Sequence, residues 1–113
     1  MKAAAVKATW TGVCALDSLV PGRGVAALVA GEQVAIFLVD GDLYAIGNRD
    51  PFSDAYVMSR GIVGTKGGVP KVASPMYKQT FDLRTGVCFE KPEVSIPVWA
   101  VRCVDGRVEV SHA

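Results

Sequence analysis

Short β-branched runs separated by tight-turn signals constrain the fold of this chain more than any other feature. Asp40-Gly41 and Asp105-Gly106 each stand between two apolar runs. An Asp-Gly pair in this setting favours a two-residue hairpin, because a type I′ turn needs positive φ at both central residues. Ala30-Gly31-Glu32 makes a similar break between Val25–Val29 and Val34–Val39. The sequence therefore predicts antiparallel hairpins rather than helices.

The same signals divide most of the chain into short strands, and no long window has helical periodicity. The predicted strands are Thr9–Ala15, Val25–Val29, Val34–Val39, Leu43–Ile46, Val69–Ala73, Thr80–Leu83, Val87–Phe89, Val98–Val104 and Val108–Val110. In the last of these, apolar and charged residues alternate (Val108, Glu109, Val110), as in a half-buried edge strand. Asn48–Pro70 is predicted as a loop, with a short turn of helix or strand at Tyr56–Met58 and a flexible tip at Gly67-Gly68. The expected fold is all-β, a small sandwich or barrel of short antiparallel strands.

Length and charge bound the remaining possibilities. A chain of 113 residues has room for one core, so residues 1–113 are expected to form a single domain, with residues 1–8 frayed. Twelve Lys and Arg against eleven Asp and Glu give a net charge of +1, which offers no case for nucleic acid or an anionic membrane. The apolar runs are too short to span a bilayer, and no secretory signal is evident. We expect a cytoplasmic protein.

Residues able to hold a metal or to serve in catalysis are few. The three cysteines, Cys14, Cys88 and Cys103, are far apart and are predicted as small buried hydrophobes on strands. The one histidine, His112, is next to the last residue, where a solvated side chain is expected. No spacing of Cys and His suits a structural zinc. The acidic residues of the loops, Asp50, Asp54 and Asp82, are predicted as turn formers and surface charges.

One glycine-rich stretch matches the residue pattern of a cofactor-binding motif but lacks the strand and helix that the motif requires. Gly22–Ala27 fits G-x-G-x-x-A, the fingerprint of dinucleotide-binding folds. That site needs a strand before the glycines and a helix after them, whose N-terminus holds the pyrophosphate. Here Pro21 precedes the stretch, and Gly31 interrupts the run that follows. We predict a turn.

Two other stretches carry a more specific pattern. Ser74–Gly86, SPMYKQTFDLRTG, resembles the second cluster-binding loop of Rieske iron–sulfur domains, and Leu43–Phe52, LYAIGNRDPF, resembles the run into the first. The Ser59-Arg60-Gly61 turn and the closing hairpin at Asp105-Gly106 also resemble that family. The resemblance extends from Trp10 to Val110. It implies a Rieske-like (ISP-type) small β-sandwich or barrel.

The ligand positions of that family are altered in this chain. Asp50 and Phe52 stand where the first loop has Cys and His, and Ser74 and Tyr77 stand where the second loop has them. A Rieske centre needs two thiolates on one iron and two imidazoles on the other. These four positions are therefore degenerate. We predict no cluster, no other metal, and no catalytic or cofactor-binding residue in this chain.

One branch of the superfamily has the same departures. The combination Asn-x-Asp-Pro-Phe, Ser-Arg-Gly and Ala-Ser-Pro-x-x-Lys-Gln-x-Phe resembles the small subunit of NAD(P)H-dependent assimilatory nitrite reductases. It is carried here by Asn48, Asp50–Phe52, Ser59–Gly61, Ala73–Pro75, Lys78, Gln79 and Phe81. The resemblance implies a cytoplasmic accessory subunit without its own redox centre, in nitrate assimilation. Its partner, the large subunit of nitrite reductase, would carry FAD, siroheme and an iron–sulfur cluster and reduce nitrite to ammonium.

The degenerate tip suggests a docking surface. Arg49, Phe52, Met76, Tyr77 and Lys78 would place apolar and aromatic side chains beside cations, as partner interfaces often do. Alternatively, Phe52 and Tyr77 fill the space of the missing cluster. For Phe52, core filling is the better interpretation. For Tyr77, core filling and docking have equal weight. The rival functions are a Rieske-type ferredoxin that transfers electrons and a non-enzymatic small β-barrel binding module.

Overall fold

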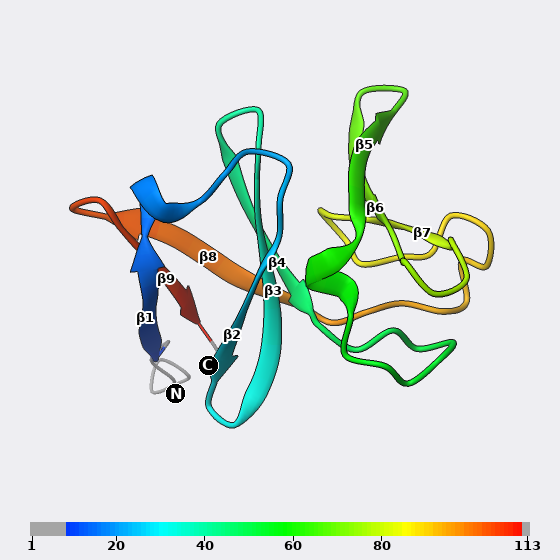
Figure 1. Cartoon of the computed structure of the whole chain (residues 1–113), viewed down its shortest axis with the longest axis horizontal. Coiled ribbons are helices and arrows are strands. Elements are labelled where there is room, and N and C mark those ends of the chain that lie inside the picture. Colours follow the sequence, from blue (N-terminus) through cyan, green and yellow to red (C-terminus); the bar gives the residue numbers. More distant parts are fainter. Residues whose placement is uncertain (1–8, 112–113) are drawn as a thin grey trace, which may run out of the picture.

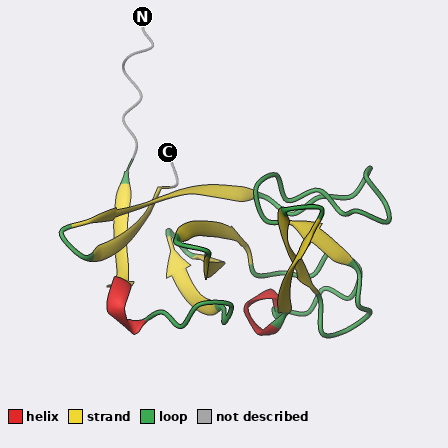
Figure 2. Ribbon diagram, turned by 90° about the horizontal axis from the view of Figure 1, so that it is seen from above, coloured by secondary structure: helices red, strands yellow, loops and turns green. Residues whose placement is uncertain are grey.

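Two antiparallel sheets form the molecule in this computed structural model, which describes residues 9–111 (Figure 1). The larger sheet has the strand order β1-β9-β8-β4-β3-β2, and the smaller one has the order β5-β6-β7. The outermost strands of the larger sheet, β1 and β2, lie close together, so the sheet is nearly closed into a barrel. Figure 2 shows the two sheets side by side, with long loops around the smaller one. The all-β, Rieske-like expectation is confirmed.

The larger sheet contains β1 (Trp10–Ala15), β2 (Val25–Val29), β3 (Glu32–Val39), β4 (Asp42–Gly47), β8 (Val98–Val104) and β9 (Arg107–Ser111). The smaller sheet contains β5 (Ile62–Lys66), β6 (Val69–Ala73) and β7 (Thr80–Asp82). Two short 3₁₀ helices, η2 (Leu16–Ser18) and η3 (Met58–Arg60), lie in the connections. Residues 1–8 and His112, for which we expected fraying and solvation, lie outside the described residues.

The hairpins predicted from Asp-Gly pairs are confirmed. The φ angles are 51° and 83° at Asp40 and Gly41, and 51° and 77° at Asp105 and Gly106. These positive values at both central residues are those that a type I′ turn requires, and they match the twist of the flanking strands. Ala30 and Gly31 form the same kind of turn between β2 and β3, with φ of 51° and 83°.

Three sequence predictions about strands were wrong. β5 lies inside the segment predicted as a loop and pairs with β6 across Gly67-Gly68. β9 lies between β1 and β8, because the N-terminal strand pairs along its outer side, so it is not an edge. Val87–Phe89 contributes only isolated bridges, such as Phe81 to Cys88. At Tyr56–Met58 the chain forms a bridge and then enters η3.

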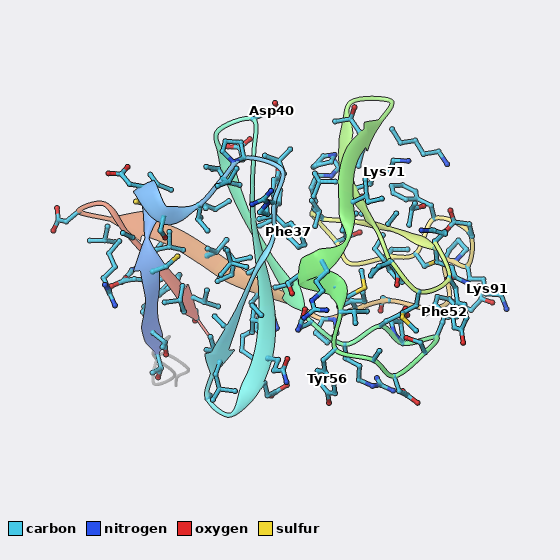
Figure 3. The ribbon with its side chains drawn as sticks, in the orientation of Figure 1. Phe37, Asp40, Phe52, Tyr56, Lys71 and Lys91 are labelled. Carbon is cyan, nitrogen blue, oxygen red and sulfur yellow. The ribbon has the colours of Figure 1, made fainter. Side chains whose placement is uncertain are left out.

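The β3–β4 hairpin is the wall between two hydrophobic cores. Alternate side chains of β3 enter opposite cores, since successive residues of a strand point to opposite faces. Phe37 packs with Val72 and Phe81 of the smaller sheet, and Figure 3 labels it between the two sheets. Ile36 packs with Val108 of β9 inside the larger sheet. Burial on both faces explains why β3 is an almost continuous apolar run.

Two expectations about polar and sulfur-containing side chains need correction. Asp50 is fully buried and Asp82 is 7% exposed, so these two turn formers are not surface charges. Their carboxylates instead accept hydrogen bonds within the protein. Cys88 is buried, but Cys14 is only partly buried. Cys103 is exposed, because it lies two residues before the turn at Asp105, at the outer end of the β8–β9 hairpin. In the described part of the chain, no helix is long and apolar enough to cross a membrane.

Candidate functional site

A buried hydrogen bond joins the two loops that resemble the Rieske cluster-binding loops. Ser74 Oγ donates to Asp50 Oδ2 at 2.6 Å, and both side chains are fully buried. The other carboxylate oxygen of Asp50 accepts from the amide of Phe52 at 2.9 Å. Ser74 Oγ also accepts from the amide of Met76 at 3.2 Å. A contact between two polar side chains therefore cross-links the loops at the two positions where the Rieske pattern has cysteines.

The donor set at the four ligand positions does not fit a [2Fe–2S] cluster. Asp50 and Ser74 are bonded to each other, and the ring of Phe52 packs 6.2 Å from that of Phe81, centroid to centroid. Tyr77, at the fourth position, is 59% exposed. Among the described residues, no group of three or more His, Cys, Asp and Glu side chains could hold a metal ion.

The five candidate docking residues differ in their exposure. Met76 and Tyr77 are 47% and 59% exposed, and they lie beside the exposed Lys78 in a single turn. Phe52 is half-buried and packs against the core, at the end of the molecule formed by the loops of the smaller sheet (Figure 3). Arg49 is exposed and forms an ion pair with Asp54 of its own loop.

Asn48 anchors the first loop to neighbouring segments of the chain, a role that was not predicted from the sequence. Its buried amide Nδ2 donates to Gln33 Oε1 at 3.0 Å and to the carbonyl of Tyr56 at 3.3 Å. Its Oδ1 accepts from the amide of Ser59 at 2.7 Å. A buried asparagine with all its polar groups satisfied fixes the backbone around it. Its position directly after a strand was the available signal, but the pattern could not name its partners.

Glu90 holds the base of the second loop. One carboxylate oxygen accepts from Thr80 Oγ1 at 2.6 Å, and the other accepts from the Thr80 amide at 2.9 Å and from Cys88 Sγ at 3.5 Å. Desolvation by burial would raise the pKa of Glu90, but the hydrogen bonds from Thr80 outweigh it and lower the pKa to about 2. No local motif connects Thr80 to Glu90, so this contact could not be predicted from the sequence.

Asp82 makes a similar turn contact at the end of β7. Its carboxylate accepts from the backbone amide of Arg84 at 2.8 Å and from the guanidinium Nη2 at 3.1 Å. Burial would raise the pKa of Asp82, but these hydrogen bonds from Arg84 outweigh it and lower the pKa. Asp82 therefore stabilises the turn at residues 84–86, at the end of the second loop.

Comparison with known proteins assigns the chain to a family. Residues 9–111 match the Rieske-like [2Fe-2S] domain family. The chain is also 43% identical over 103 residues to the nitrite reductase (NADH) small subunit of Salmonella typhimurium strain LT2, an alignment covering 89% of this chain and 95% of the relative. The chain belongs to the Rieske-like family of nitrite reductase small subunits.

Two further matches, one named as a small subunit and one as a large subunit, extend the comparison. A crystal structure described as that of an NADH-dependent nitrite reductase small subunit from Mycobacterium tuberculosis has a TM-score of 0.93 and 50% identity, covering 96% of this chain and 98% of that one. The chain is also 37% identical to part of the nitrite reductase [NAD(P)H] large subunit of Klebsiella oxytoca, an alignment covering 91% of this chain and 11% of that relative. Small-subunit sequences thus have a counterpart within a large-subunit chain.

Proposed function

We propose that this chain is an accessory subunit of an NAD(P)H-dependent nitrite reductase and has no redox centre of its own. The observation that carries the proposal is the buried Asp50–Ser74 hydrogen bond, 2.6 Å long, at the positions of the two Rieske thiolates. Neither side chain supplies the sulfur ligands that a Rieske centre requires. The fold is retained while the donor set is replaced, which favours a structural or docking role over electron transfer.

The partner in this proposal is the large subunit, which would carry FAD, siroheme and an iron–sulfur cluster and reduce nitrite to ammonium in the cytoplasm, for nitrate assimilation. The Klebsiella relative supports the pairing, since a similar sequence there aligns within a chain named as the large subunit. In the present protein the association would be non-covalent. Catalysis would take place on the partner, and this chain would supply surface.

The absence of a cluster is tested by aerobic purification of the chain, followed by an absorption spectrum and by iron and sulfide assays. The expected result is no visible absorption band and no iron in proportion to protein. Stoichiometric iron and sulfide would overturn the proposal and would favour the Rieske-type ferredoxin alternative.

The exposed turn Met76–Lys78 is the proposed docking tip. Tyr77 presents its ring to solvent, and the charge of Lys78 lies beside it. Changing Tyr77→Ala together with Lys78→Glu should weaken co-purification with the large subunit, and it should leave the circular dichroism spectrum unchanged. Leu28→Ala, at an exposed apolar residue (68%) outside both loops, is the control for the loss of exposed apolar surface. Unchanged co-purification of the double variant would exclude this tip as the interface.

A further inference from the structure

Two arginine-containing turns that are far apart in the sequence meet at one open cleft. The cleft has a volume of about 530 Å³ and is lined by residues 22–24 and residues 59–63. Its lining shares no residue with the loop tip at Met76–Lys78. The dinucleotide-like glycine stretch supplies one wall of the cleft, and the Ser-Arg-Gly turn supplies the other.

The two walls are held in fixed positions. A Cβ atom on Gly24 would collide with the carbonyl oxygen of Ser59, so the absence of a side chain permits this close approach. The amide of Arg23 donates to the carbonyl of Val20 at 2.9 Å. The amide of Ser59 donates to the buried Asn48 side chain at 2.7 Å. The two arginines therefore extend from a preorganised backbone.

The charges of these two arginines are not balanced within the cleft. Arg23 and Arg60 are exposed, no acidic residue lines the cleft, and in the described part of the chain neither arginine forms an ion pair. Three other arginines each have a carboxylate partner, in the pairs Arg49–Asp54, Arg84–Asp82 and Arg102–Glu109. The cleft is thus a concave, cationic surface, and its lining contains no negative charge that could balance the two arginines.

One wall of the cleft continues into the open edge of the smaller sheet. Ile62 and Val63 begin β5, which is the outermost strand in the order β5-β6-β7. Ile62 is 66% exposed. An unpaired strand edge presents backbone donors and acceptors to an incoming extended segment. Cationic, apolar and backbone hydrogen-bonding groups therefore lie next to one another.

We propose that this arginine cleft docks an extended, carboxylate-bearing segment of the large subunit. The inference rests on the proposed function. Guanidinium groups bind carboxylates in a bidentate manner, and two of them on facing walls suit acidic side chains of one segment. A cleft of about 530 Å³ is much larger than a single small oxyanion needs, and its edge strand and apolar Ile62 suit a peptide. Complementary charge also increases the rate of association.

The experiment measures the dissociation constant between this chain and the purified large subunit by calorimetry, for the wild type, Arg23→Glu, Arg60→Glu and the double variant. Each single change should weaken binding about tenfold, because each removes a charge-assisted contact and introduces repulsion. Added salt should weaken binding of the wild type more than binding of the double variant. Arg107→Glu is the matched control, since Arg107 is exposed and forms no ion pair within the described residues, but lies outside the cleft. It should bind like the wild type.

The outcomes separate this inference from the proposed function. If the wild type binds the large subunit and the arginine variants bind equally well, the cleft is not the docking site and the subunit assignment stands. If the wild type does not bind, the proposed function itself fails. A cleft that binds inorganic phosphate, as seen by shifts of the Gly24 and Arg60 amide resonances, with no loss of partner affinity in the double variant, would be a small-anion site and would overturn the inference. Circular dichroism and the unfolding midpoint confirm that each variant is folded.

Discussion

At the scale of single residues, buried polar side chains hold the loops that a metal cluster holds in a Rieske centre. Asp50 and Ser74 bond across the two loops, and Asn48 secures the first loop to β3 and to η3. Burying such groups costs free energy unless their hydrogen bonds are made, so each is sensitive to the loss of one partner. The loop tips should therefore respond to substitutions that remove only a few atoms.

Ser74→Ala tests the cross-link between the loops. The change removes the donor to Asp50 Oδ2 and leaves that buried oxygen without its 2.6 Å partner. The free energy of unfolding should fall by roughly 1.5–3 kcal/mol, the usual range for a hydrogen bond to an ionisable group. Urea denaturation measures it. Ser53→Ala, at a partly buried serine of the first loop, is the control and should cost less than about 1 kcal/mol. Equal losses for the two variants would show that the cross-link contributes little.

Glu90 should make the stability of the second loop depend on pH. Because its pKa is about 2 in the folded protein, against an ordinary value of 4.5, the unfolded chain binds a proton more readily. The stabilisation is complete above about pH 5 and is lost as the pH falls through about 2. Glu90 is exposed to solvent, so screening limits the effect to about 1 kcal/mol.

The measurement for Glu90 compares urea denaturation at several pH values for the wild type and Glu90→Gln. The wild type should lose more stability than the variant between about pH 5 and pH 2. Asp82, whose pKa is also lowered, remains in both proteins, so its contribution cancels in the comparison. Parallel pH profiles for the two proteins would contradict the role assigned to Glu90.

At the scale of elements, the turn after β7 is fixed from two sides. Gly86 has a φ of 78°, its amide donates to the Asp82 carbonyl at 2.7 Å, and its carbonyl accepts from the amide of Ile96 at 2.8 Å. A Cβ atom at this position would collide with the Ile96 carbonyl oxygen. The turn therefore requires glycine for its conformation and for its packing.

Gly86→Ala should consequently destabilise the protein by about 3 kcal/mol or more, through left-handed strain and overpacking together. Gly106→Ala is the matched control. Gly106 has nearly the same φ, 77°, but no atom lies within 4 Å of an added Cβ. It should cost only the conformational strain, about 1–2 kcal/mol. Denaturation midpoints of the two variants measure the difference, and equal costs would refute the packing argument.

At the scale of the whole molecule, the β3–β4 hairpin makes the two cores depend on each other. Phe37 is fully buried and faces the core under the smaller sheet, while Ile36 faces the core of the larger sheet. A strand with both faces buried transmits the loss of packing on one side to the other, because its backbone belongs to both cores. The two sheets should unfold in one transition.

Phe37→Ala tests this coupling and should lower the free energy of unfolding by about 3–5 kcal/mol. Trp10 and Trp99 lie on β1 and β8, so their fluorescence reports on the larger sheet. The methyl resonances of Val72 report on the smaller one. The two signals should shift to lower denaturant together in the variant. Two separate midpoints would show that the sheets unfold independently.

Local features of the fold could be predicted from sequence, and features that depend on distant contacts could not. The hairpins at Asp40 and Asp105 follow from turn chemistry within a few residues. β5 was missed because Ile62–Lys66 contains a glycine and lacks clean alternation, so its strand conformation depends on pairing with β6. β9 was predicted as an edge because its alternation does not show that β1 pairs with its outer side.

The candidate site divides in the same way. The sequence by itself predicted that Asp50, Phe52, Ser74 and Tyr77 stand at the four ligand positions, because the loop patterns set the register of the comparison. Only the tertiary structure decided that the first three are buried or partly buried while Tyr77 is exposed. It alone brought the turns of Arg23 and Arg60 together at one cleft. The physical reason is that turn geometry is encoded between neighbouring residues, whereas burial and charge balance depend on which distant segments meet.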